Sequence, residues 1–165
     1  MVTGNRLSFR TFVLATCGLA ALLTLLAWNT NAPTMGSVLT AASDPLGYYQ
    51  YLPALLLHGN AHTMAYVHYL ENGNGLNLFT MGVAIMQAPF FLGAWLYSAL
   101  IGAPSTGFEL PFVFARLLAT ASYTALGTLF LVQVLLLRTH RFTAWLTASA
   151  ILFGTTLYFY TVHAG

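Results

Sequence analysis

The spacing of charge along this chain constrains its fold more than any other feature. Only eight of the 165 residues are formally charged, and all of them except Arg116 fall before or between long apolar runs. A soluble domain carries about 25% charged residues, whereas this chain has 5% charged and 58% hydrophobic residues. The sequence therefore predicts an integral membrane protein of the all-α class, folded as a single membrane domain over residues 1–165.

Net charge argues against one class of function. The formal net charge is only +2, and most of the arginines lie close to the ends of apolar runs, so no nucleic-acid partner is expected. The arginines are better interpreted as signals of membrane orientation, because cytoplasmic loops are enriched in Lys and Arg. The single Cys17 lies inside the first apolar run and carries no information about the redox compartment.

Four apolar runs are long enough to be candidate membrane spans. They cover residues 11–28, 80–101, 112–137 and 142–162. The first is about 18 residues long, which exceeds the ~7–15 residues of a signal-peptide core and favours an uncleaved span over a cleaved signal. Arg6 and Arg10 precede this run and predict a cytoplasmic N-terminus in a multi-pass protein of the inner (plasma) membrane.

Residues 29–79 differ in kind from the apolar runs. They contain no Lys or Arg and are rich in Asn, Gly and Tyr, which is typical of an outer loop. Within them, residues 46–58 place aromatic and leucine side chains at helical spacing over too few residues to span. This pattern predicts an amphipathic helix lying in the plane of the lipid headgroups. The sequence NGNG at 72–75 predicts a turn.

Four membrane crossings would conflict with the positive-inside rule. If all four runs cross, the segment 138–141 with its two arginines lies outside, against the positive-inside rule. If the run 80–101 only dips into the membrane, that segment lies inside. Pro89 and Gln87, near the middle of this run, fit a re-entrant helix, which requires shielding by protein. We therefore favour three transmembrane helices plus one re-entrant helix, with a fourth span as the alternative.

Asp44 stands in the predicted outer loop and is the candidate catalytic residue. The sequence Ser43-Asp44-Pro45 favours a helix start, because Asp is a good N-cap and Pro suits the first turn. The functional alternative is a general base or a metal ligand at the membrane surface. The two roles are compatible, since a helix cap lies at a loop tip that a substrate can reach.

Arg116 lies about one turn inside the outer end of the run 112–137. A charge at this depth is costly unless it snorkels to the surface, pairs, or faces a polar cavity. Snorkelling is the simpler interpretation. The functional interpretation is contact with a lipid-linked phosphate, which arginine binds through bidentate charge-assisted hydrogen bonds.

Histidines offer a weak indication of metal binding. His58 and His62 are four residues apart and could bind zinc from one face of a continuous helix. Gly59 and Asn60 lie between them and disfavour such a helix. No organic cofactor is expected, and a divalent metal stays an open question.

Three segments of the chain follow one another in an order and at a spacing that are typical of one family. They are SDPLGYYQYLP at 43–53, MGVAIMQAPFF at 81–91 and FARLL at 114–118. In this combination the chain resembles the N-terminal part of polytopic GT-C glycosyltransferases, the class of protein mannosyltransferases and lipid A aminoarabinose transferases.

The resemblance implies transfer of a sugar from a polyprenyl-phosphate donor to an acceptor on the outer side of the membrane. It implies that Asp44 acts as the base or positions the acceptor, and that Arg116 lies near the donor phosphate. Tyr48 and Tyr49 would border the same cavity and contact the substrate.

The chain departs from the family pattern in composition and in length. Pro45 stands where many members carry a second acid, and neutral residues such as Gln87 stand near Pro89, where characterised members carry a basic residue. The family also has many more spans. We therefore expect an incomplete N-terminal fragment, inactive alone, that needs the remaining transmembrane helices or a partner subunit. The alternative is a small non-enzymatic membrane subunit or anchor that packs against a partner.

Overall fold

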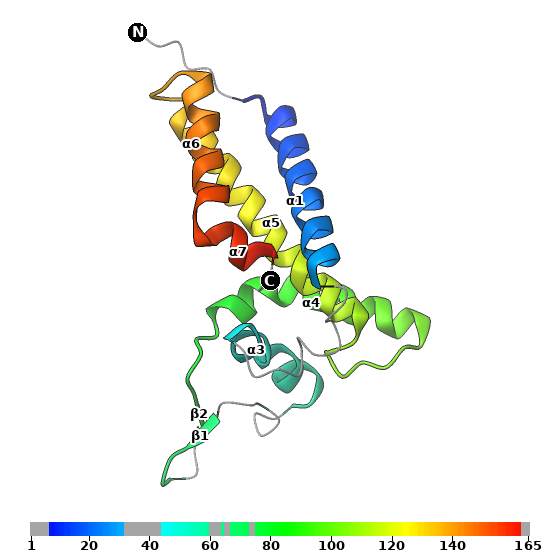
Figure 1. The fold of residues 1–165 in the computed structure, drawn as a ribbon. Coiled ribbons are helices and arrows are strands. Elements are labelled where there is room, and N and C mark those ends of the chain that lie inside the picture. Colours follow the sequence, from blue (N-terminus) through cyan, green and yellow to red (C-terminus); the bar gives the residue numbers. More distant parts are fainter. Residues whose placement is uncertain (1–6, 32–43, 60–63, 65–66, 73–74, 163–165) are drawn as a thin grey trace. The chain divides into compact units, whose positions relative to one another are not determined.

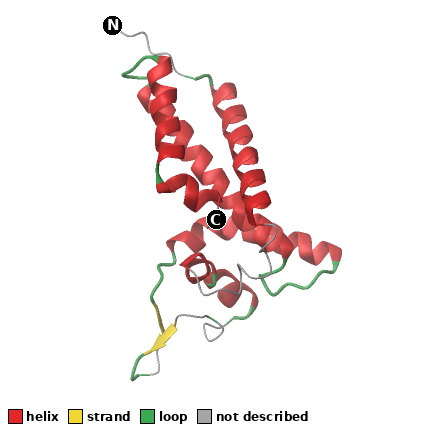
Figure 2. Ribbon diagram, in the orientation of Figure 1, coloured by secondary structure: helices red, strands yellow, loops and turns green. Residues whose placement is uncertain are grey.

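The computed structural model describes residues 7–31, 44–59, 64, 67–72 and 75–162, which are mostly helical (Figures 1 and 2). Its helices are α1 (Phe9–Asn31), α3 (Asp44–Tyr49), the π-helix η2 (Pro53–Leu57), α4 (Gly82–Ile101), α5 (Leu110–Leu135), α6 (Arg141–Gly154) and α7 (Thr156–Val162). Three of them, α1, α4 and α5, are long and apolar enough to cross a membrane, and α6 with α7 makes a fourth candidate if that bent pair is one span. The prediction of a helical chain with span-length apolar helices is confirmed.

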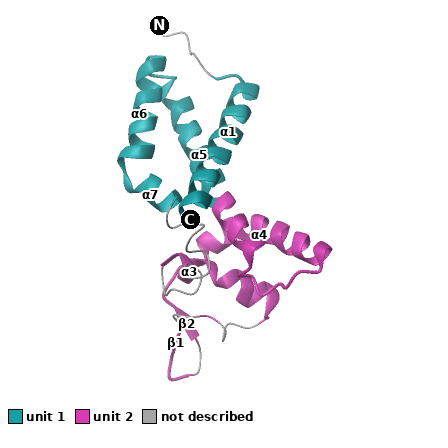
Figure 3. Cartoon of the chain, turned by 45° about the vertical axis from the view of Figure 1, so that its right-hand side comes forward, with its two compact units in different colours: residues 1–30, 120–165 teal, residues 31–119 magenta. Residues whose placement is uncertain are grey.

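The chain divides into two compact units (Figure 3). Unit 1 comprises residues 1–30 and 120–165, and unit 2 comprises residues 31–119. Helix α5 begins in unit 2 and continues into unit 1.

In unit 1, α1 and α5 run antiparallel. The Leu7 backbone N–H donates to Gln133 Oε1 (3.1 Å) near the start of α1 and the end of α5. Towards the end of α1, Leu23 shares a buried cluster with Ala121. Residues later in α1 therefore meet residues earlier in α5. It follows that the end of α1 and residue 120 lie at the same end of unit 1.

Helices α6 and α7 run back along this pair. Ala144 and Ala148 of α6 are buried in one cluster with Val132 of α5 and with Leu136, the residue after α5. At the far end, Val162 of α7 is buried with Leu23 and Ala121. The α6–α7 segment therefore extends from the α5–α6 connection to the opposite end of unit 1.

The structure differs from the sequence analysis at residues 142–162, where a single helix was expected. Helices α6 and α7 meet at a 62° bend. Gly154 ends α6, and Thr155 is extended (φ −124°, ψ 176°). The Thr155 hydroxyl donates to the Ile151 carbonyl (2.7 Å) and accepts from the Leu157 N–H (3.2 Å). A weak helix former followed by a threonine that bonds the backbone is a known cause of helix bending.

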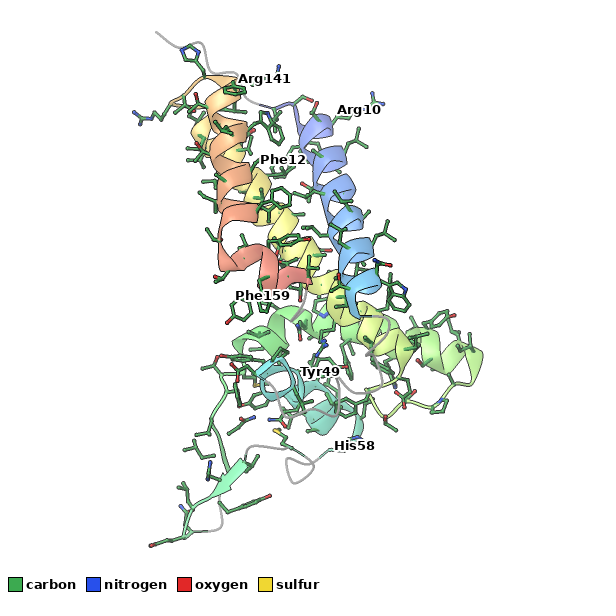
Figure 4. All side chains as sticks on the ribbon, in the orientation of Figure 1. Arg10, Phe12, Tyr49, His58, Arg141 and Phe159 are labelled. Carbon is green, nitrogen blue, oxygen red and sulfur yellow. The ribbon has the colours of Figure 1, made fainter. Side chains whose placement is uncertain are left out.

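The described arginines of unit 1 gather at one of its ends. Arg10 lies in the first turn of α1, Arg138 lies in the α5–α6 connection and Arg141 begins α6. Figure 4 shows Arg10 and Arg141 at the same end. Arg6 lies outside the described residues.

The core of unit 2 forms where α3, α4 and the start of α5 meet. One face of α4 is buried, with members three and four residues apart: Ala84, Gln87, Phe91, Ala94 and Ser98. Its apolar members pack in a single cluster with Tyr49 and Leu52 from the α3 region and with Phe112 and Ala115 of α5. The 3–4 spacing of the buried face is that of an amphipathic helix.

Unit 2 also carries a small antiparallel hairpin of β1 (Val67–Tyr69) and β2 (Gly75–Asn77). His68 is opposite Leu76 in its register. The sequence predicts a turn at 72–75, of which residues 73–74 lie outside the described residues, but it does not predict the strands. Each strand has only three residues, which is too short for a recognisable alternation.

Candidate functional site

Asp44 is the first residue of α3 and is exposed. Pro45 follows it in the first turn, where its missing N–H costs nothing. The described helix begins at Asp44, as the sequence predicts, and Ser43 lies outside the described residues. At about 100° per residue, Tyr48 falls on the same face of α3 as Asp44, whereas Tyr49 lies about 140° away.

The face of α3 that carries Tyr48 packs on Phe79. The rings of Tyr48 and Phe79 meet edge to face, with their centroids 5.0 Å apart. The Tyr51 hydroxyl donates to the Phe79 carbonyl (2.6 Å). Gly47 lies against the same ring, so closely that a Cβ atom there would overlap it. Tyr48 is therefore held by an aromatic contact with the segment that leads into α4.

The opposite face of α3 carries Tyr49 into the core, where it is 2% exposed. Its hydroxyl donates to the Gly107 carbonyl (2.5 Å). Its ring packs against Phe91 of α4 and Phe108, with centroids 6.0 and 5.9 Å away. The guanidinium carbon of Arg116 lies 5.7 Å from the centre of the same ring. Tyr49 thus joins α3, α4 and the start of α5.

Arg116 is buried, with only 4% of its surface exposed. The simpler sequence interpretation, a side chain that snorkels to the surface, is therefore wrong. The tyrosine ring offers the negative face of its π-system to the cation, an interaction of about 2 kcal/mol or more where water is excluded. A cation held in this way is a costly feature that the fold must compensate.

Burial strongly raises the pKa of the Tyr49 hydroxyl above its ordinary value of 10.0. The Arg116 charge opposes this shift in pKa, and Glu109 adds to it slightly. The hydroxyl therefore stays protonated at physiological pH and acts as a hydrogen-bond donor. It cannot serve as a base.

Glu109 organises the turn between α4 and α5. Its carboxylate accepts hydrogen bonds from the Thr106 N–H (2.9 Å), the Thr106 hydroxyl (2.7 Å) and the Gly107 N–H (3.1 Å). Partial burial raises the pKa of Glu109, but these hydrogen bonds outweigh it, so the pKa is lowered overall. Glu109 fixes Gly107, whose carbonyl receives the Tyr49 hydroxyl, and so supports the site indirectly.

Two buried glutamines accompany this junction. Gln50 is 3% and Gln87 is 9% exposed. The amide of Gln50 donates to the Gly47 carbonyl (3.2 Å). Both Oε1 atoms are buried and receive no hydrogen bond from the described part of the chain. Neither glutamine is among the predicted site residues, although a glutamine inside the apolar run 80–101 is a usable signal of a polar site.

The four predicted site residues thus separate into two groups. Arg116 and Tyr49 are in contact and buried. Tyr48 packs on Phe79, and Asp44 is exposed on the Tyr48 side of α3.

Metal ligands do not cluster in the part of the chain that the structure describes, which contains no group of three or more His, Cys, Asp or Glu side chains able to hold an ion. His58 is exposed at the end of η2. Its possible zinc partner, His62, lies outside the described residues.

Comparison with known proteins adds no relative. No protein-family model matches the chain, and no curated protein or solved structure shows significant similarity to it.

Proposed function

We propose that this chain is the N-terminal membrane part of a GT-C-type glycosyltransferase. The enzyme would transfer a sugar from a polyprenyl-phosphate donor to a hydroxyl acceptor on the outer side of the membrane. The observation that carries the proposal is the buried Arg116, which lies directly against the short helix whose first residue is Asp44. A guanidinium is the side chain best suited to a phosphate, and an exposed carboxylate is suited to act as a base.

The proposed reaction is a displacement at the anomeric carbon of the sugar. The Asp44 carboxylate takes the proton of the acceptor hydroxyl while the oxygen forms a bond to that carbon. The bond from the carbon to the phosphate oxygen breaks, and the phosphate leaves with the electron pair. Arg116 would stabilise the charge that develops on the phosphate, and the Tyr49 hydroxyl would be available as a donor.

This mechanism requires movement of α3. The Arg116 guanidinium lies over the Tyr49 ring, and Asp44 is on a different face of α3 from Tyr49. A phosphate would therefore reach the guanidinium only if α3 shifted and released the Tyr49 ring. Helix α3 has only six residues, and a helix this short depends on its tertiary contacts for stability.

The proposed location is the inner (plasma) membrane, with the N-terminus cytoplasmic. It is supported by the gathering of Arg10, Arg138 and Arg141 at one end of unit 1, because positive charge favours the cytoplasmic side. Activity would require the remaining transmembrane helices of the enzyme or a partner subunit.

A second candidate is a non-enzymatic membrane subunit or anchor. It is favoured by the close packing around Arg116, since a buried arginine stacked on Tyr49 can serve to hold α3 in place without any substrate. In that case Asp44 would be a helix-starting residue only.

Replacement of Asp44 distinguishes the two candidates. We expect Asp44→Asn to reduce transfer from a polyprenyl-phosphate sugar by at least ~100-fold, the lower range for loss of a general base, with unchanged membrane insertion. The measurement is sugar transfer in membrane vesicles that contain the whole protein as the cell makes it. Glu71→Gln, at an exposed acid in the turn after β1, is the matched control. Equal turnover in all three proteins would reduce Asp44 to a helix start and favour the anchor.

A further inference from the structure

The segment 31–119 leaves unit 1 and returns to it at the same end. This follows from the antiparallel pairing of α1 with α5, in which Leu7 meets Gln133 and Leu23 meets Ala121. The ring contact between Phe12 and Phe130 (centroids 5.1 Å apart) fits between these two points. If α1 and α5 both cross the membrane, the chain between them must begin and end on one side.

Helix α4 is the single helix of span length in the described part of 31–119. Helices α3 and η2 have only six and five residues, and a crossing needs about 17 or more. Residues 32–43, the longest stretch of this segment that lies outside the described residues, are also too few for a crossing. A full crossing by α4 would leave the chain on the wrong side to begin α5.

The surface of α4 is nevertheless that of a helix in hydrocarbon. No Asp, Glu, Lys or Arg occurs between Glu71 and Glu109. Only the stripe from Ala84 to Ser98 is buried, and large apolar side chains cover the remaining faces. Ile85 is 60% and Leu100 is 77% exposed.

Water would be a poor solvent for this surface. Each Å² of apolar area withdrawn from water stabilises by about 25 cal/mol, so the exposed side chains of α4 favour a hydrocarbon environment strongly. Apolar faces without charged side chains are suited to contact with lipid acyl chains, because a charged side chain in hydrocarbon is costly in free energy. The polar side chains of Gln87 and Ser98 lie on the buried stripe, facing protein. Trp95 and Tyr97 are exposed, and both residue types are enriched at the boundary between lipid and water.

We propose that α4 is embedded in the outer leaflet without crossing the bilayer, with its exposed faces in contact with lipid acyl chains. The helix would enter and leave on the side opposite the arginine end of unit 1. This inference is independent of the proposed glycosyltransferase activity, because it rests only on chain direction, helix length and surface composition.

Sidedness of the loops provides the first test. In a Cys17→Ala background, single cysteines replace Asn72 in the β1–β2 turn, Ser105 in the α4–α5 loop and Thr139 in the α5–α6 connection. A membrane-impermeant maleimide added to intact cells should label positions 72 and 105 and should label 139 only after permeabilisation. Labelling of 105 from the side opposite 72 would show that α4 crosses, and would overturn the proposal.

Depth and occupant are tested with spin labels in vesicles of phosphatidylcholine and phosphatidylglycerol. Labels at Ile85, Leu92, Leu96 and Leu100 should all be accessible to oxygen and protected from a water-soluble nickel chelate, at depths within one leaflet. A label at Thr106 is the water-exposed control. Depths at Ile85 and Leu100 in opposite leaflets, or low oxygen accessibility at all four sites because protein covers them, would contradict the proposal.

Discussion

The two units of this protein divide its charge almost completely. Unit 1 holds four of the five arginines and no Asp or Glu, whereas unit 2 holds all three acids and a single arginine, Arg116. The described basic residues of unit 1 are exposed at one end, while Arg116 is buried. Charge in unit 1 can thus set orientation, and charge in unit 2 contributes to the packed structure.

The cores differ in the same sense. Aliphatic side chains and alanines dominate the clusters of unit 1. The cluster of unit 2 contains the aromatic rings of Tyr49, Phe91 and Phe112, and the unit also buries three polar side chains, Gln50, Gln87 and Arg116. Polar atoms in a core cost free energy unless they are satisfied. Unit 2 therefore bears the cost that a functional site commonly carries, and unit 1 has the character of a scaffold.

The largest effect on folding is expected at Gly107, because its backbone and its surroundings both require glycine. It has φ +92°, and a Cβ there would lie 2.6 Å from Pro53 Cβ. Gly107→Ala should destabilise unit 2 by about 2–4 kcal/mol through left-handed strain and overpacking. Gly102 shares a positive φ (+65°) but has open space around it, so Gly102→Ala should cost only about 1 kcal/mol. Denaturant unfolding in detergent measures both, and equal losses would show that the Pro53 contact is unimportant.

The next effect concerns Arg116 and separates stability from binding. Replacement of a buried charge by a hydrophobic residue of similar size is often neutral or stabilising. We therefore expect Arg116→Met to keep the unfolding midpoint within a few degrees, but to weaken binding of a polyprenyl phosphate by ~10–100-fold, the value of a lost charged hydrogen bond. Arg138→Met, at an exposed arginine of unit 1, is the control. If both variants bind the lipid phosphate like the parent protein, Arg116 has only a structural role.

A smaller effect is expected from the hydroxyl of Tyr49. Tyr49→Phe removes the hydrogen bond to the Gly107 carbonyl and keeps the ring under Arg116. It should cost about 1 kcal/mol of unfolding free energy. Tyr48 contacts Phe79 through its ring, so Tyr48→Phe should cost less. Thermal unfolding of the two variants compares the two faces of α3 directly, and a greater loss from Tyr48→Phe would contradict the assignment of Tyr49 to the core.

The sequence indicated much of the scaffold and only part of the site. Apolar runs and charge spacing predicted helices over most of α1, α4 and α5, because those signals are local and repeated over many residues. The bend at Thr155 was missed, since the residues 142–162 stay apolar through it. The separation of Asp44 and Tyr49 onto different faces of α3 follows from helical spacing and was open to prediction.

The burial of Arg116 could not be read from the sequence in the same way. Its depth in the run 112–137 fits snorkelling and burial equally well. The choice is made by Tyr49, which lies 67 positions earlier in the chain, and by the turn at Gly107 that receives the tyrosine hydroxyl. A contact at such separation leaves no periodic trace in a single sequence.

In unit 1, the contact between Leu7 and Gln133 should have a modest effect. Gln133→Leu removes the hydrogen bond from the Leu7 N–H to Gln133 Oε1. Side-chain hydrogen bonds between membrane helices contribute about 0.6 kcal/mol on average, so a loss near this value is expected. Val134→Leu, on an exposed face of α5, is the control. A loss comparable to that of Gly107→Ala would contradict the view that apolar packing dominates unit 1.

Acid should affect unit 2 before unit 1, with the smallest of these effects. The hydrogen bonds from Thr106 and Gly107 outweigh burial and lower the pKa of Glu109 in the folded protein. At a pH between the folded and the unfolded pKa of Glu109, the unfolded chain binds more protons than the folded chain. The contribution of Glu109 to the free energy of unfolding is therefore fully present above the unfolded pKa of about 4.3. It is lost as the pH falls through the folded pKa. Because Glu109 is only partly buried and solvent screens its charge, we expect less than about 1 kcal/mol. Hydrogen exchange from pH 6 to pH 3 should show increased opening around residues 106–109.

Two variants sharpen this acid test. Glu109→Gln should remove much of the pH dependence at residues 106–109, and Thr106→Val, which loses the hydrogen bond from the Thr106 hydroxyl, should reduce it. Unit 1 contains no Asp or Glu, so no carboxylate side chain there can respond over this range. Acid-induced opening that began in α1 or α6 instead would show that the two units are not independent in their response to charge, and the division between scaffold and site would have to be abandoned.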